Sequence, residues 1–140
     1  MKRMSIAALV LSLPLIAKAA DGPYLFDFVA DHHTGKAYNA LISRHKLPGW
    51  VKGGGTSTPA DIITIKGERF YALSGCKPHN CPAEAISVLY SLDKGSIFGL
   101  FSEYDSTKDR QTLVWMNLDA SNSDEMRNLL FSRLYGDLSK

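Results

Sequence analysis

Short segments rich in β-branched and aromatic residues follow one another from residue 62 to residue 117 of this 140-residue chain, and only turn sequences separate them. Gly67, Gly95 and a polar run at 105–109 mark three of these turns. Such short connections join antiparallel neighbours, because parallel strands need a long crossover, so the segments favour an antiparallel meander. Its five predicted strands cover residues 62–65, 69–74, 85–91, 97–104 and 112–117.

Apolar residues occupy both faces of these predicted strands. Ile86, Val88 and Tyr90 alternate with Ala85 and Leu89, so the two sets of side chains point to opposite faces of the sheet. A sheet that is apolar on both faces must be covered on both faces. The segments before and after the strands are the ones available to cover it.

Helical patterns lie on either side of the strand region. A short apolar segment at 24–30 precedes a helix predicted at 34–45, and a last helix is predicted at 123–135. Ser123 is a suitable N-cap for this last helix, and Gly136 is a suitable stop. The expected buried stripes are Tyr38, Leu41, Ile42 and His45 in the first long helix, and Met126, Leu129, Leu130 and Leu134 in the last. The predicted fold class is α+β, a three-layer α/β/α arrangement with a five-stranded antiparallel meander sheet flanked by helices.

The N-terminus has the three parts of a cleavable export signal. A cationic start at 1–3 precedes an apolar run at 6–16 and a small-x-small cleavage site at 17–19. The apolar run is shorter than the roughly 20 residues that span a bilayer, and no later stretch approaches that length. We therefore expect residues 1–19 to be a signal peptide, residues 20–140 to form a single domain, and the mature product to be periplasmic.

The charge balance changes when the signal is removed. The whole chain carries 16 basic and 14 acidic residues, a formal charge of +2. Lys2, Arg3 and Lys18 leave with the signal and no acid does, so 16 − 3 = 13 basic residues face 14 acidic ones, a net charge of −1. A near-neutral surface lacks the positive footprint of a nucleic-acid-binding protein and slightly favours a cationic partner. The sequence predicts neither a nucleic acid nor a membrane as partner.

The most informative local feature is Gly-Cys-Lys-Pro-His-Asn-Cys-Pro at 75–82, which joins two predicted strands and therefore forms a hairpin tip. An even pair of cysteines this close, Cys76 and Cys81, predicts a disulfide in an oxidising compartment. Pro78 and Pro82 restrict their own φ and the conformation of the residue before each. The tip is therefore stiff, and the side chains that it displays are Lys77, His79 and Asn80.

A rigid projecting loop loses little conformational entropy when it docks, which favours a role in binding. His79 suits a cleft lined with carboxylates, because a charged imidazole donates hydrogen bonds from both ring nitrogens. The alternative is structural: the Cys76–Cys81 disulfide staples a hairpin, and His79 is an ordinary exposed loop residue. The loop residues alone leave both interpretations open.

Catalytic and metal-binding interpretations of the same residues are weaker. Redox dithiols normally have two residues between the cysteines, whereas four residues separate Cys76 from Cys81. A disulfide also leaves no thiolate for covalent catalysis. A metal site would use His79 as a third ligand, with His32 or His33 as distant candidates, and would need thiols that stay reduced after export. The sequence predicts no metal and no cofactor.

Other enzyme-like features also have structural explanations. Glu103 and Asp105 could mimic a glycosidase pair, but a solvated strand end explains them better. The loop expected at 52–59 holds a Gly-Gly-Gly run, which lacks the Lys-Ser/Thr of a phosphate-binding loop and is interpreted as a flexible connector. Trp50 and Trp115 are expected in the core. No residue pattern indicates an enzyme.

The run Cys-Lys-Pro-His-Asn-Cys at 76–81 resembles the signature loop of the Ivy family of periplasmic lysozyme inhibitors, usually Cys-Lys-Pro-His-Asp-Cys. His-Lys-Leu-Pro-Gly-Trp-Val at 45–51, Gly-Leu-Phe-Ser at 99–102 and Leu-Val-Trp-Met-Asn at 113–117 resemble further segments of the family. The resemblance implies two helices, a five-stranded antiparallel meander and C-terminal helical structure in three layers. This agrees with the fold predicted from the residue pattern.

The resemblance also implies binding to C-type lysozyme and occupation of its active cleft. The loop histidine, here His79, would hydrogen-bond the two catalytic carboxylates, and Cys76 and Cys81 would hold the loop. The other loop residues expected at the contact are Lys77, Pro78 and Asn80. Because the family has Asp in place of Asn80, a negative charge is missing here.

The sequence leaves open whether the protein forms a homodimer and whether its partner is a lysozyme or another enzyme. Family members often form dimers, so the resemblance leaves a homodimer open, although the sequence has no assembly signature. An endogenous lytic transglycosylase, which also uses a carboxylic acid in a sugar-binding cleft, is the alternative partner. A thiol redox protein is the third, weaker alternative.

Overall fold

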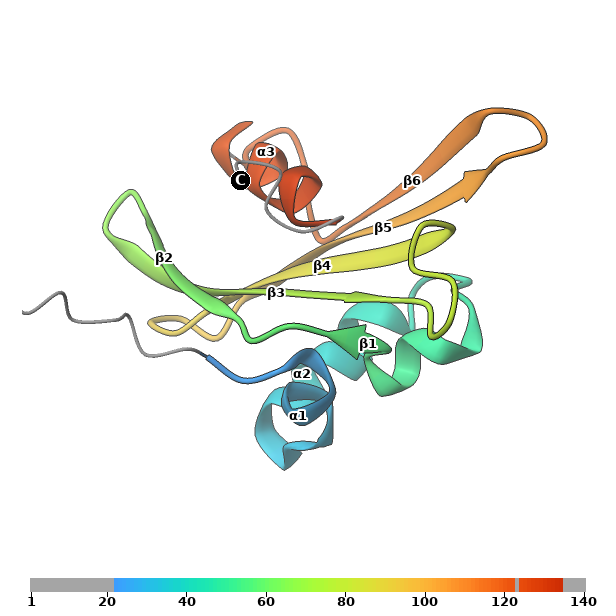
Figure 1. Cartoon of the computed structure of the whole chain (residues 1–140). Coiled ribbons are helices and arrows are strands. Elements are labelled where there is room, and N and C mark those ends of the chain that lie inside the picture. The colour runs from blue at the N-terminus through green and yellow to red at the C-terminus, as the bar shows by residue number, and fades with distance from the viewer. Residues whose placement is uncertain (1–21, 123, 135–140) are drawn as a thin grey trace, which may run out of the picture.

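The computed structural model describes residues 22–122 and 124–134 (Figure 1). In chain order its elements are α1 (Leu25–Ala30), α2 (His32–Ile42), the 3₁₀ helix η1 (Gly49–Gly53), β1 (Thr56–Ser57), β2 (Asp61–Ile65), β3 (Glu68–Cys76), β4 (Glu84–Ser91), β5 (Ile97–Asp105), β6 (Arg110–Met116) and α3 (Asp124–Arg133). The predicted signal peptide, the N-cap Ser123 and the stop Gly136 lie outside the described residues.

The described residues include 6 strands, which form one antiparallel sheet. Because β1 and β2 both pair with β3, one after the other along its length, the sheet is five strands wide. β3, β4, β5 and β6 are neighbours in chain order, as the predicted meander requires. β2 pairs with the first part of β3, and β1 pairs with its end, where Thr56 lies opposite Cys76. The sequence predicts a loop throughout 52–59, which is wrong at residues 52–53, the end of η1, and at β1. Pro59, which has no N–H to donate, lies in the break between β1 and β2.

Helices cover both faces of the sheet, and a hydrophobic core lies between each pair of layers (Figure 1). Ile86 and Val88 of β4 pack in the core with α1 and α2, whereas Ala85 and Leu89 pack in the core with α3. The predicted alternation is therefore confirmed, and with it the three-layer α+β fold. The core with α1 and α2 includes Leu25, Phe28, Tyr38, Leu41 and Met116, and the core with α3 includes Phe70, Leu100, Met126, Leu130 and Leu134.

Helix α2 begins two residues before its predicted start and ends three residues before its predicted end. Its N-cap, Asp31, has an extended backbone, and its Oδ1 accepts hydrogen bonds from the N–H groups of His33 and Thr34, both at 2.9 Å. Such a cap satisfies N–H groups that have no partner within the helix. His45 lies beyond the end of the helix and is half-buried. The buried residues of the predicted stripe are Tyr38, Leu41 and Ile42.

Asp31→Ala is expected to lower the melting temperature at neutral pH, because the N–H groups of His33 and Thr34 lose their acceptor. Hydrogen bonds from Thr34 and then His33 lower the pKa of Asp31 below its ordinary value of 3.8. A carboxyl group with a lowered pKa in the folded state adds stability above its unfolded pKa, and that stability is lost as the pH falls through the folded pKa.

Thermal unfolding followed by circular dichroism should show the full difference in melting temperature between Asp31→Ala and wild type at neutral pH. The difference should shrink as the pH falls below 3.8. Asp31→Asn is the control, since asparagine is also a good N-cap. A loss of stability that is independent of pH, or is equally large for asparagine, would contradict the capping role.

Candidate functional site

Strand β3 ends and strand β4 begins at the same end of the sheet, and the connection between them, residues 77–83, is a projecting loop (Figure 1). Cys76 and Cys81 form the predicted disulfide, with their Cα atoms 4.7 Å apart. The β3–β4 ladder ends where Cys76 lies opposite Ala85. The disulfide therefore closes the loop at the point where strand pairing stops.

Two consecutive turns shape the loop. The N–H of Asn80 donates to the carbonyl of Lys77 (3.0 Å), and the N–H of Ala83 donates to the carbonyl of Asn80 (3.1 Å). In the first turn Pro78 takes the second position, which suits its restricted φ, and His79 follows with a φ of 64°. This is the pattern of a type II turn, whose third residue is usually glycine or asparagine. Histidine at this position places an imidazole at the apex of the turn.

The loop residues predicted to contact a partner differ in exposure. Pro78, His79 and Asn80 are exposed, whereas Lys77 is half-buried. The Lys77 ammonium lies 3.5 Å from Oε1 of Glu84, and the Lys77 N–H donates to the backbone carbonyl of Glu84 (3.0 Å). The tip therefore presents His79 and its two neighbours, and Lys77 is turned toward the first residue of β4.

Glu84 is a polar residue beside the loop that no sequence pattern singles out. It begins β4, and its Oε2 accepts a hydrogen bond from the Nε1–H of Trp50. Trp50 is half-buried against the core with α1 and α2, which agrees with its expected place in the core. The link joins residues 34 positions apart. The Pro-Ala-Glu sequence after Cys81 gives no sign of this partner.

The last two residues of the glycine run, Gly54 and Gly55, are closely packed beneath the loop, which contradicts the interpretation of the run as a flexible connector. Gly54 and Gly55 have φ values of 83° and 64°, a region that strains other residues. A Cβ on Gly55 would lie 2.3 Å from the carbonyl oxygen of Cys76 and 2.7 Å from the ring of Trp50. The missing side chain therefore lets η1 and the end of β3 approach each other.

The other polar and aromatic candidates have separate structural roles. Asp105 accepts hydrogen bonds from two N–H groups of the β5–β6 turn (3.0 and 3.2 Å), and Glu103 is exposed on β5. Trp115 is half-buried against the core with α3. His32 and His33 begin α2, and no three His, Cys, Asp or Glu side chains in the described ranges are grouped to hold a metal ion. Within the same ranges, no helix is long and apolar enough to cross a membrane.

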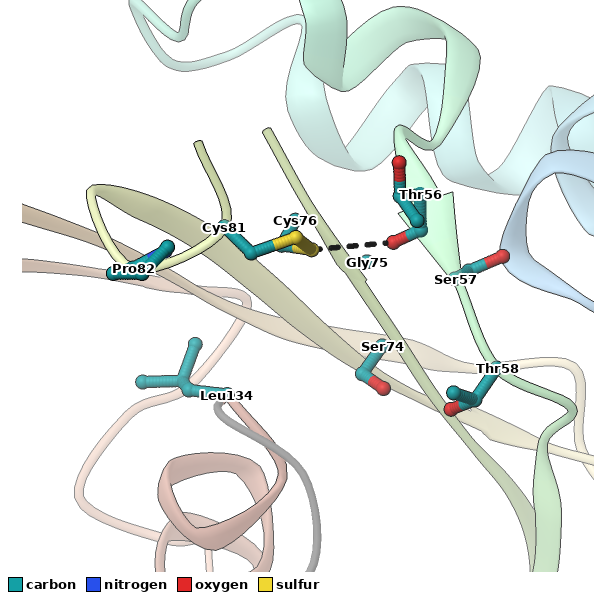
Figure 2. Close-up of a pocket in the computed structure, with 9 residues that line it drawn as sticks. All are labelled: Thr56, Ser57, Thr58, Ser74, Gly75, Cys76, Cys81, Pro82 and Leu134. Carbon is teal, nitrogen blue, oxygen red and sulfur yellow. Dashed lines mark hydrogen bonds between the residues drawn. A yellow bond between two sulfur atoms is a disulfide. The ribbon is translucent and has the colours of Figure 1, made fainter. Parts of the chain in front are cut away.

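A hollow of about 470 Å³ lies at the base of the loop, between the disulfide and Leu134 (Figure 2). Its walls come from β1, the end of β3, Pro82 and the residue that follows α3. On the β1 side, Sγ of Cys76 lies 3.5 Å from the carbonyl oxygen of Thr56. His79 does not line the hollow, so the exposed tip and the hollow are separate parts of the loop surface.

The fold and the loop together define a small α+β protein whose distinctive surface is a preorganised, disulfide-closed hairpin tip. A family model described as "Inhibitor of vertebrate lysozyme (Ivy)" matches residues 34–130. The chain belongs to the Ivy family, which confirms the resemblance seen in the loop sequence.

Relatives with this description occur in Escherichia coli and in Pseudomonas aeruginosa. The chain is 35% identical over 134 residues to "Inhibitor of vertebrate lysozyme" of Escherichia coli K12, a match that covers 96% of this chain and 84% of that protein. A protein of the same description from Pseudomonas aeruginosa is 27% identical over 86 residues, which cover 60% of this chain and 56% of that protein. An uncharacterized protein of Yersinia pestis is 42% identical over 55 residues, which cover 39% of this chain and 36% of that protein.

Proposed function

We propose that this protein inhibits C-type lysozyme by placing His79 in the active cleft of the enzyme. The observation that carries the proposal is the exposed imidazole at the apex of a disulfide-closed turn. Membership of a family described as inhibitors of vertebrate lysozyme supports the choice of partner. Lysozyme is a retaining glycosidase, so the chemistry of that enzyme class indicates what a loop in its cleft would meet.

A retaining glycosidase works with one protonated and one ionised carboxyl group about 5–5.5 Å apart. A charged imidazole between them can donate to both groups from its two ring nitrogens. The positive charge is attracted to the ionised carboxylate, and the ring fills the space that the sugar needs. Inhibition by His79 is therefore competitive with the polysaccharide, and the imidazole itself offers no bond to cleave.

The histidine cannot supply the whole affinity. One hydrogen bond to a charged group contributes about 1.5–3 kcal/mol, whereas nanomolar binding needs about −12 kcal/mol. Pro78 and Asn80 flank His79 and would supply part of the remaining contact, together with the exposed part of the Lys77 side chain. A loop held by a disulfide loses little entropy on docking, which lowers the cost of binding. Asn80 carries no charge, so it contributes no long-range attraction to a basic enzyme.

We also propose that the protein is exported and that it has no catalytic activity. Residues 1–19 would be removed as a signal peptide, and residues 20–140 would act as a non-enzymatic inhibitor in the periplasm. An oxidising compartment is the environment in which the disulfide persists.

The decisive experiment is an inhibition assay with purified mature protein, residues 20–140, and a C-type lysozyme acting on peptidoglycan. We expect competitive inhibition at micromolar concentration or below. A G-type lysozyme and a lytic transglycosylase serve as comparison enzymes. Full lysozyme activity in the presence of folded protein at micromolar concentration would refute the proposal, and inhibition of the transglycosylase alone would assign the loop to that enzyme.

A further inference from the structure

The disulfide-closed loop is attached to the sheet on both of its faces. Cys76 and Ala85 pack on the face covered by α3. Glu84 precedes Ala85 on β4, so its side chain lies on the opposite face, where Trp50 of η1 packs against the core with α1 and α2. The disulfide therefore restrains the loop from one face, and the contacts of Glu84 restrain it from the other.

Glu84 joins the loop to η1 through its two carboxylate oxygens. Oε2 accepts a hydrogen bond from the Nε1–H of Trp50, and Oε1 lies 3.5 Å from the ammonium of Lys77. The Glu84 side chain is only 14% exposed, so water has little access to replace either partner. Hydrogen bonds to an ionised carboxylate are stronger than those between neutral groups. We call these three residues, Glu84, Trp50 and Lys77, the Glu84 network.

The rest of the molecule holds Trp50 in place. Its ring lies 6.3 Å from that of Phe101 on β5, measured between centroids, and it packs over Gly55. On the side of the loop that faces β5, the N–H of Tyr104 donates to the carbonyl of Ala83 (2.8 Å). The Glu84 network therefore connects the loop to a segment that packs firmly against the sheet.

We propose that Glu84 is a positioning residue that holds Lys77, and through it the turn carrying His79, in one orientation relative to the sheet. The disulfide closes the loop into a small ring, but a ring attached along one edge can still tilt about that edge. The Glu84 network opposes this tilt on the face that the disulfide does not reach. The effect on lysozyme binding rests on the proposed function, whereas the effect on the loop does not.

Glu68 offers a matched control at the other end of the sheet. Like Glu84, it is the first residue of its strand and is half-buried. Its Oε1 accepts a hydrogen bond from the hydroxyl of Ser91 (2.6 Å), and its Oε2 lies 3.7 Å from the ammonium of Lys94. Glu68→Ala therefore removes a similar set of contacts from a site that does not touch the loop.

Amide hydrogen exchange in the free protein tests the positioning directly. Glu84→Ala is expected to accelerate exchange of the Lys77 and Asn80 amides at least about tenfold, because the turn opens more often, and to leave Val88 in β4 unchanged. Glu84→Gln keeps an acceptor for the indole but no charge for the ammonium, so its exchange rates should fall between those of Glu84→Ala and wild type. Glu68→Ala should leave both loop amides at the wild-type rate.

Unchanged exchange of both loop amides in Glu84→Ala would overturn the proposal, whatever the partner of the loop. If the alanine variant does not fold, Glu84→Gln and Trp50→Phe decide the question in the same way. Trp50→Phe retains an aromatic ring but removes the indole N–H. Its loop amides should therefore exchange faster than those of wild type. Wild-type exchange rates in both Glu84→Gln and Trp50→Phe would also overturn the proposal.

Dissociation constants for a C-type lysozyme test the consequence for binding. Glu84→Ala is expected to weaken binding about tenfold in the wild-type background but less than about threefold in a His79→Gly background, since no imidazole is then left to position. Equal weakening in the two backgrounds would overturn the positioning role. Absence of binding by the wild-type protein would refute the proposed function instead, and hydrogen exchange would still decide the role of Glu84.

Discussion

Replacing His79 with glycine is expected to raise the inhibition constant for a C-type lysozyme at least about a hundredfold while leaving the protein as stable as wild type. The charged imidazole would supply two charge-assisted hydrogen bonds of about 1.5–3 kcal/mol each, and its loss leaves the two carboxyl groups of the enzyme without these donors. A factor of ten in affinity corresponds to about 1.4 kcal/mol, so two such bonds account for the expected loss.

Glycine is the informative substitution because it separates the chemistry of His79 from its backbone strain. The φ of 64° is unstrained for glycine but unfavourable for alanine, so alanine would lose the imidazole and keep the strain. His79→Asn, which tolerates this region but carries no charge, should inhibit as weakly as the glycine variant. Inhibition constants from peptidoglycan hydrolysis and melting temperatures from circular dichroism provide the two readouts.

A histidine outside the loop provides the control for this experiment. His33 is exposed at the start of α2, and His33→Asn should inhibit as well as the wild-type protein. If His79→Gly instead inhibits within about threefold of wild type, the loop does not act through its imidazole, and the structural interpretation of the hairpin is then correct.

Gly55→Ala is expected to destabilise the fold by roughly 2–5 kcal/mol, because it combines a left-handed backbone with overpacking. The added Cβ would lie 2.3 Å from the carbonyl oxygen of Cys76, a backbone atom that cannot move without disturbing β3. It would also press on the ring of Trp50 at 2.7 Å. Because both neighbours adjoin the loop, inhibition should weaken together with stability.

Gly53→Ala is the matched control for this substitution. Gly53 is two residues earlier in the same glycine run, and a Cβ placed on it meets no atom within 4 Å. Denaturant unfolding followed by circular dichroism should show a wild-type midpoint for Gly53→Ala and a much lower midpoint for Gly55→Ala. Equal midpoints for the two variants would contradict the close packing beneath the loop.

The layered architecture was predictable because strand periodicity reports burial directly. Ile86 and Val88 on one face and Ala85 and Leu89 on the other belong to two separate cores, as the alternation requires. Helix boundaries were predicted less well. Asp31 was not recognised as an N-cap, since the apolar stripe of α2 begins only at Tyr38.

The candidate site was predictable in its covalent part. Spacing and export predict the Cys76–Cys81 disulfide, and the prolines predict a stiff tip, both from residues within a few positions of one another. The left-handed conformation of His79 was not predictable, because histidine is not the usual residue at the third position of a type II turn. The contact between Glu84 and Trp50 was equally hidden, since 34 positions separate the two residues.

Local pattern and covalent chemistry were therefore sufficient for the meander, the two covered faces and the closed loop, because each depends on neighbours in the chain. The close packing of Gly55 against Cys76, the pairing of β1 with β3 and the contacts of Glu84 depend on segments that only folding brings together. A glycine run or a lone glutamate has the same local appearance in a mobile loop and in a packed contact. Its role is decided by the atoms that surround it in the folded protein.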